Sequence, residues 1–158
     1  MAWNEIQQLS PSHIIISPGP GSPCNSGISL SVINNISNNI PILGVCLGHQ
    51  SIGCVYGASI SHAPYPVHGK TSAIYHSGKG IFSGIPSPFD AARYHSLIIE
   101  SDQLPKYLEI TGWTEDGTIM ACQHKLYSHV YGIQFHPESL WTTYGKKLLN
   151  NFLHFKNS

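Results

Sequence analysis

The most constraining feature of the sequence is a cysteine between two glycines, where an apolar run meets a helical pattern. Residues 41–45 are apolar, Cys46 follows them, and residues 47–56 have the pattern of a helix. A tight turn from strand to helix leaves no room for β-carbons beside the cysteine, which explains Gly44 and Gly48. This G-x-C-x-G run has the form of a strand–elbow–helix and predicts an α/β fold with Cys46 above the carboxyl edge of a sheet.

The elbow alone supports two interpretations. In the first, the free N–H groups and positive dipole end of the helix that begins at Leu47 lower the pKa of the Cys46 thiol and make it a nucleophile. In the second, Cys46 is a buried structural cysteine between two packing glycines. Further residues are needed to decide between them.

A rigid loop follows an earlier apolar run. Residues 14–16 are isoleucines, which predict a buried strand, and the proline- and glycine-rich segment 17–23 ends it. Prolines fix φ and glycines let the backbone approach a ligand, so the loop can direct N–H groups at an oxyanion. Gly19 and Gly21 can donate, whereas Pro20 cannot. An ordinary stiff turn is the alternative.

A histidine at the end of a later strand is the candidate base. His136 follows the strand-like run 130–135, at an edge where α/β sheets bind ligands. Pro137 stiffens the next turn, and Glu138 can fold back to the imidazole. There it would fix the tautomer and stabilise the imidazolium that forms when Cys46 loses its proton. A strand-terminal histidine beside a solvent-facing glutamate is the alternative.

The rest of the pattern predicts one α/β domain over residues 1–158, with a mostly parallel central sheet flanked by helices. Apolar residues recur at helical spacing over 28–36, and a last helix begins near Thr143. The stretch 59–76 is rich in Pro, Gly and His and predicts loops and short strands. Further strands are expected at 91–99, 109–114, 119–124 and 130–135, with Asp116-Gly117 as a hairpin signal.

Composition argues against several partners and sites. The 8 basic and 8 acidic residues cancel, and no apolar run could cross a bilayer, so we expect neither a nucleic-acid nor a membrane partner. No targeting peptide is visible at the start. The four cysteines show no C-x-x-C spacing, and a disulfide framework is not expected in a chain this long, which indicates a reducing compartment. Zinc on Cys46 and His49 lacks a second ligand pair, so no metal is expected.

The segments SPGPGSP, GVCLGHQ and GIQFHPES stand in one order, and this order resembles the class I (triad-type) glutamine amidotransferases over about Asn4 to Phe155. Further segments resemble the glutaminase subunits of anthranilate synthase and aminodeoxychorismate synthase: 68–71, 80–82, 88–89, 93–97 and 113–114. Residues 41–53 and 138–142 are most similar to versions encoded in red-algal plastids. The resemblance therefore implies a plastid location, with the cytoplasm as the alternative.

The resemblance implies a flavodoxin-like fold and a role for each matched residue. Cys46 would be the nucleophile, His136 the base and acid, and Glu138 the group that orients His136. The residues expected to bind glutamine or its oxyanion are Gly19, Pro20, Gly21, Leu47, Gln50, Ser96 and Leu97. Those expected to face a partner subunit are His68, Gly69 and Lys70.

The implied reaction hydrolyses glutamine through a γ-glutamyl thioester on Cys46. The ammonia would pass to chorismate on a large subunit, anthranilate synthase component I, and this subunit would need no cofactor. One alternative is the matching subunit of aminodeoxychorismate synthase. Another is a non-catalytic remnant that only binds a partner. A different cysteine hydrolase on the same scaffold would not need segments 68–70 and 93–97.

The resemblance does not include the opening of the family. Its members normally begin with a strand, an Asp-Asn-Tyr-Asp-Ser-Phe segment, a helix and a second strand, the bulk of a βαβ unit. Nothing in this sequence corresponds to them. We therefore expect the strand at 14–16 to have an unpaired neighbouring position and some helix faces to lose their cover.

Overall fold

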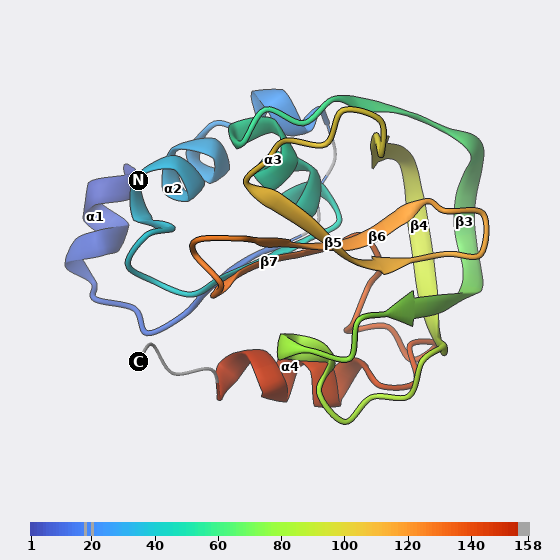
Figure 1. Cartoon of the computed structure of the whole chain (residues 1–158). Coiled ribbons are helices and arrows are strands. Elements are labelled where there is room, and N and C mark those ends of the chain that lie inside the picture. The colour runs from blue at the N-terminus through green and yellow to red at the C-terminus, as the bar shows by residue number, and fades with distance from the viewer. Residues whose placement is uncertain (18, 20, 155–158) are drawn as a thin grey trace.

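The computed structural model describes residues 1–17, 19 and 21–154, which form a sheet with helices on both faces (Figure 1). The strands are β1 (Ile14–Ile16), β2 (Ile42–Val45), β3 (Ile60–His76), β4 (Phe89–Ile99), β5 (Leu108–Trp113), β6 (Ile119–His124) and β7 (Val130–Ile133). The helices are α1 (Trp3–Gln8), α2 (Ile28–Ile36), α3 (Leu47–Val55) and α4 (Gly145–Leu153), with single 3₁₀ turns η1 (Pro23–Asn25) and η2 (Gly80–Phe82).

The sheet has the strand order β1-β2-β7-β6-β5-β3-β4. Strands β1, β2 and β7 pair in parallel, and the remaining pairs are antiparallel. The α/β prediction is confirmed, and the sheet is mixed because parallel pairing is confined to these three strands. Their carboxyl ends consequently lie at one edge, which is where the predicted site belongs.

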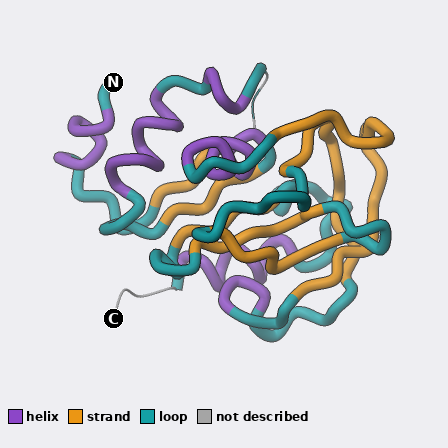
Figure 2. The backbone as a smooth tube through the Cα atoms, turned by 45° about the horizontal axis from the view of Figure 1, so that its top comes forward, coloured by secondary structure: helices purple, strands orange, loops and turns teal. Residues whose placement is uncertain are grey.

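Two hydrophobic layers cover the two faces of the sheet. Strand β2 is buried on both faces, so Leu43 and Ile42 point into different layers. One layer lies under α4 and contains Phe152, and the other lies under α2 and α3 and contains Ile33. The views in Figures 1 and 2 show α4 on the opposite side of the sheet from the other helices.

Most predicted elements are confirmed, but the prediction for residues 59–76 is wrong. That stretch forms the long strand β3, which pairs with β4 from Ile60↔Ile99 to Ile74↔Phe89. Register shifts between His62 and Val67 accommodate its prolines, which cannot donate to a ladder. A partner strand distant in sequence overrides the loop-like composition. The short helix α1 was not predicted.

Strand β1 lies at the edge of the sheet. Within the described residues it pairs only with β2, and Ile15 is 46% exposed. This matches the expectation of an unpaired position beside residues 14–16. No helix in the described part of the chain combines the length and apolarity that a membrane crossing requires.

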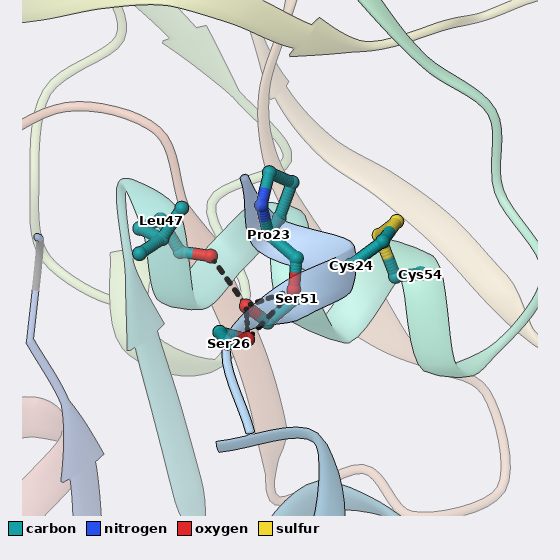
Figure 3. Close-up of a disulfide and its surroundings, with 6 residues drawn as sticks. All are labelled: Pro23, Cys24, Ser26, Leu47, Ser51 and Cys54. Carbon is teal, nitrogen blue, oxygen red and sulfur yellow. Dashed lines mark hydrogen bonds between the residues drawn. A yellow bond between two sulfur atoms is a disulfide. The ribbon is translucent and has the colours of Figure 1, made fainter. Parts of the chain in front are cut away.

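The cysteines differ from the sequence-based prediction. Cys24 of η1 and Cys54 of α3 form a disulfide across 30 residues, with their Cα atoms 5.8 Å apart (Figure 3). The expectation that the chain has no disulfide is therefore wrong for this pair, because η1 packs on α3 in a way that spacing alone does not reveal. Cys46 and Cys122 are free and buried.

Candidate active site

The three predicted segments meet at the carboxyl edge of the parallel strands. The Cys46 N–H donates to the Ile133 carbonyl at 2.8 Å, so the cysteine extends the β2–β7 pairing by one bond. His136 lies three residues beyond Ile133, and its N–H donates to the Ala92 carbonyl of β4 at 3.0 Å. The backbone therefore places both residues at one edge of the sheet.

The elbow has the steric requirements that its glycines predicted. Cys46 precedes α3 with φ +54° and ψ −102°, a conformation that non-glycine residues rarely adopt. A β-carbon on Gly44 would lie 2.5 Å from the Gly48 carbonyl group, and one on Gly48 would lie 2.6 Å from the Ile16 oxygen. Both positions therefore require glycine, and the helix start packs directly on β1.

We expect Gly44→Ala to destabilise the protein and displace Cys46. Its new methyl group would meet rigid backbone, so the free energy of unfolding should fall by about 1–3 kcal/mol. Gly19→Ala is the matched control, because its methyl group would meet only Leu47 Cδ2 at 3.6 Å. Its effect should stay within about 0.5 kcal/mol. Urea denaturation followed by circular dichroism measures both, and equal losses would contradict the steric explanation.

The Cys46 thiol lies in a mostly buried polar environment. Its Sγ is 3.8 Å from the Tyr94 carbonyl oxygen, and Gln134 Nε2 donates to it at 3.6 Å. Burial raises the pKa of the Cys46 thiol above its ordinary value, and this outweighs the lowering by the Leu47 backbone N–H. The Glu138 carboxylate raises this pKa further. The sequence-based prediction of a lowered pKa is therefore wrong for the unliganded chain.

This raised pKa predicts slow alkylation of the resting enzyme. Only the thiolate reacts with iodoacetamide, so the labelling rate of Cys46 should keep rising above pH 8.5, about the pKa of a free cysteine. Cys122 should stay unlabelled because complete burial raises its pKa to about 12, and the Cys24–Cys54 disulfide removes the other two thiols. Mass spectrometry without reductant measures the rate, and a plateau below pH 8 would contradict this assignment.

His136 and Glu138 form the contact that the sequence predicted. His136 Nδ1 lies 2.7 Å from Glu138 Oε1, so Nδ1 donates to the carboxylate. His136 Nε2 is buried and has no hydrogen-bond partner among the described residues. The Tyr94 ring packs edge-on to the imidazole at 5.3 Å. This arrangement leaves Nε2 as the nitrogen that can take up a proton.

The turn at residues 136–138 is held from two sides. The Thr142 hydroxyl donates to the His136 carbonyl at 2.6 Å and accepts the Ala92 N–H at 3.0 Å. At the start of α4, a β-carbon on Gly145 would lie 1.9 Å from the Pro137 oxygen. The first residue of α4 thus packs against this turn without any space for a side chain.

A cavity of about 230 Å³ adjoins the thiol. Its volume suits a ligand of amino-acid size rather than a drug-sized molecule. Predicted residues supply most of its wall, and Tyr94 and His95 complete it. The predicted lining residues are Gly19, Gly21, Cys46, Leu47, Gln50, His68, Ser96 and Leu97.

Some predicted residues lie elsewhere. Pro20 falls outside the described residues. Gly69 packs against the Tyr94 ring, and Lys70 pairs with Arg93 in the β3–β4 ladder, so neither lines the cavity. Glu138 lines a second hollow of about 420 Å³ instead. His136 is not on the cavity wall either.

A hydrogen-bond network fixes the far wall of the cavity. The Leu97 carbonyl accepts from both Gln50 Nε2 and His95 Nδ1 at 3.0 Å. Arg93 Nε donates to His95 Nε2 at 3.1 Å, and burial lowers the pKa of His95 to about 4, which keeps the ring neutral. Gln50 Nε2 also donates to Gln134 Oε1 at 3.1 Å. The amide nitrogen of Gln50 is thus occupied by protein groups, and its predicted contact with glutamine stays a prediction.

Metal ligation gains no support from His49. Its ring is fully buried, with Nδ1 3.6 Å from Cys122 Sγ, and burial lowers its pKa to about 3. In the described ranges, no three or more His, Cys, Asp or Glu side chains lie close enough together to hold a metal ion. His49 is therefore a neutral core residue beneath the elbow.

Three residues near the chemistry were missed from the sequence. Tyr94 presents its carbonyl to the thiol and its ring to His136, Gln134 donates to the thiol, and Thr142 holds the His136 turn. Gln134 could have been found, because a polar side chain interrupts the otherwise apolar run 130–135. The other two depend on contacts between distant segments.

Comparisons with known proteins agree with this geometry. The family model described as glutamine amidotransferase class-I matches residues 2–155. The chain is 59% identical over 150 residues to "Anthranilate synthase component 2" of Pyropia yezoensis, covering 95% of this chain and 79% of that one. It is 49% identical over 154 residues to "Anthranilate synthase beta subunit 2, chloroplastic" of Oryza sativa subsp. japonica, covering 94% and 56%. A solved structure from Thermoplasma acidophilum, assigned to GMP synthase, superposes with a TM-score of 0.83 at 26% identity, covering 97% and 75%.

Proposed function

This chain belongs to the class-I glutamine amidotransferase family, and from that membership we propose that it is the glutaminase subunit of an anthranilate synthase. The observation that carries the proposal is the placement of the Cys46 thiol on an amino-acid-sized cavity, at the same sheet edge as the His136–Glu138 pair. A structural cysteine between two glycines would need neither feature. The relative from Pyropia yezoensis, which is named for this function, gives independent support.

The proposed reaction begins with glutamine in the cavity. The Cys46 sulfur attacks the side-chain amide carbon, and the Leu47 N–H with a donor from the Gly19–Gly21 loop stabilises the oxyanion. His136 Nε2 takes the thiol proton and delivers it to the leaving nitrogen, which departs as ammonia. Water, activated by the same nitrogen, then hydrolyses the thioester and releases glutamate.

The raised pKa of the Cys46 thiol suits a subunit that waits for its substrate. At neutral pH the resting thiol is mostly protonated, because burial favours the neutral form. Transfer of its proton to His136 gives an imidazolium that the Glu138 carboxylate stabilises. In this proposal the ion pair forms only when glutamine fills the cavity.

We further propose that the ammonia passes to chorismate on a separate large subunit. A protein named component 2 implies at least one other component, which supports a larger synthase partner. His68, on the cavity wall, and the adjacent Gly69 and Lys70 of β3 would face that partner. The algal and chloroplastic relatives support a plastid location, and we propose that the gene is plastid-encoded.

The decisive experiment reconstitutes the chain with the chorismate-binding subunit of the same organism. Glutamate release from glutamine should rise on complex formation, and anthranilate should form from chorismate with either glutamine or ammonia as the nitrogen source. Formation of aminodeoxychorismate instead would assign the related synthase. A well-folded complex that uses ammonia but never glutamine would show that the chain only binds its partner.

A further inference from the structure

We propose that Cys24 and Cys54 are a site of reversible thiol oxidation, and that their disulfide holds the cavity's glycine loop against the helix that follows the nucleophile. A dithiol reductant is the class of molecule that would open it. The effect proposed here is on glutamine binding, so it rests on the proposed function. The redox chemistry of the pair does not.

The disulfide joins two elements that flank the cavity (Figure 3). Cys24 lies in η1, which directly follows the loop that contains Gly19 and Gly21. Cys54 lies in the last turn of α3, and the first residue of this helix follows Cys46. One covalent bond therefore ties the end of the loop to the helix on which the nucleophile is mounted.

The other side-chain contacts at this junction are weaker. Ser51 Oγ lies 2.8 Å from the Leu47 carbonyl oxygen and 3.4 Å from that of Pro23. Because a hydroxyl has one proton, donation to Pro23 competes with the shorter bond within α3. Ser26 Oγ donates to the Pro23 carbonyl at 2.6 Å, but both belong to the segment that would move. A 3.0 Å contact between Ser26 Oγ and Ser51 Oγ adds one hydroxyl bond across the junction.

Glycines stand on both sides of the tied segment. Gly21 has φ +100° and Gly27 has φ +52°, and a β-carbon at either position would meet no atom within 4 Å. These residues are therefore chosen for their backbone conformation and not for close packing. Residues 22–26 can turn about the two glycines once the disulfide opens, as hinged segments do.

The pair is accessible, unlike the other cysteines. Cys24 is exposed, Cys54 is half-buried, and both border an open hollow of about 400 Å³ beside α2. Cys46 and Cys122 are buried. Permanent disulfides are uncommon in a reducing compartment, and exposed disulfides are those that exchange readily and serve regulation. Exposure and the proposed plastid location together favour a disulfide that opens and closes.

The chemistry is a balanced thiol–disulfide exchange. A thiolate of the reductant attacks Cys24 Sγ, the bond between the two sulfurs breaks, and Cys54 leaves as a thiolate that takes up a proton. The second thiol of the reductant then displaces Cys24, which also takes up a proton. Two electrons pass to the protein, and the reductant becomes a disulfide. The oxidised reductant reverses both steps.

Reduction should weaken glutamine binding. A free loop must be ordered again whenever glutamine enters the cavity, so the KM for glutamine should rise about three- to tenfold. The ammonia-dependent reaction of the complex does not use this cavity and should be unchanged. Oxidation should restore the lower KM.

The test compares the complex after equilibration with reduced or oxidised dithiothreitol, with peptide mass mapping to report the state of the pair. A Cys24→Ser/Cys54→Ser double variant is the matched control, because a reductant can also act on Cys46. The double variant should show the higher KM under both conditions, whereas the native complex should switch between the two values. An unchanged KM in the native complex, or an equal response in the double variant, would overturn the proposal.

A second readout needs no activity. In the isolated chain, amide hydrogen exchange of peptides covering residues 17–27 should accelerate on reduction, and the double variant should exchange at the faster rate throughout. If the chain never turns over glutamine, the proposed function fails, while mass mapping and exchange still decide the redox site. Exchange that is independent of the redox state, or a pair that stays unlinked under oxidation, would refute it.

Discussion

Cys46→Ser should lower glutamine-dependent anthranilate synthesis by about 10³-fold or more while leaving ammonia-dependent synthesis intact. Serine keeps the size of the side chain and the φ of +54°, so the elbow should survive. Its hydroxyl is a far weaker nucleophile than a thiol under the same base. Anthranilate fluorescence of the complex, with each nitrogen source in turn, measures both rates.

The matched control for this variant is Cys122→Ala, which removes the other free thiol. Cys122 is fully buried, contacts His49 and does not line the cavity, so glutamine use should persist. Undiminished glutamine use in Cys46→Ser would show that the cysteine is not the nucleophile. Loss of both nitrogen sources would instead indicate that the complex no longer assembles.

The parts of the site that sequence alone predicted are those whose physics is local. Gly44 and Gly48 are required by a turn of a few residues, and Glu138 reaches an imidazole two positions away. The three isoleucines of β1 are read as a strand because nothing else in their neighbourhood competes. Such features need no knowledge of what packs against them, which is why they transferred directly to the structure.

The features that sequence did not predict depend on distant partners. Residues 59–76 become a strand only because β4 lies beside them, and the Cys24–Cys54 contact exists only because η1 packs on α3. The pKa of Cys46 has the same origin. The helix start lowers it, as local reasoning suggests, but burial by the assembled cavity raises it more. Local reasoning located the nucleophile and gave the wrong sign for its resting charge.

A comparison of His136→Ala with Glu138→Ala should separate the base from the group that orients it. His136→Ala removes the atom that accepts the proton, whereas Glu138→Ala leaves a base that is only less well oriented. The rate loss in Glu138→Ala should therefore be roughly 10²-fold smaller, in line with triads in which the acid contributes less than the histidine. Glutamate release by the complex measures both losses, and the opposite order would contradict the assigned roles.

A second effect of Glu138 has the opposite sign and makes the test sharper. Its carboxylate raises the pKa of the Cys46 thiol, because a negative charge opposes formation of the thiolate. Glu138→Gln removes this charge, so that pKa should fall and iodoacetamide should label Cys46 faster at a fixed pH near 8. Turnover should nevertheless drop, because glutamine amide cannot stabilise the His136 imidazolium as a carboxylate does. A faster-reacting thiol in a slower enzyme is the combination that only this division of roles predicts, and slower labelling together with slower turnover would reject it.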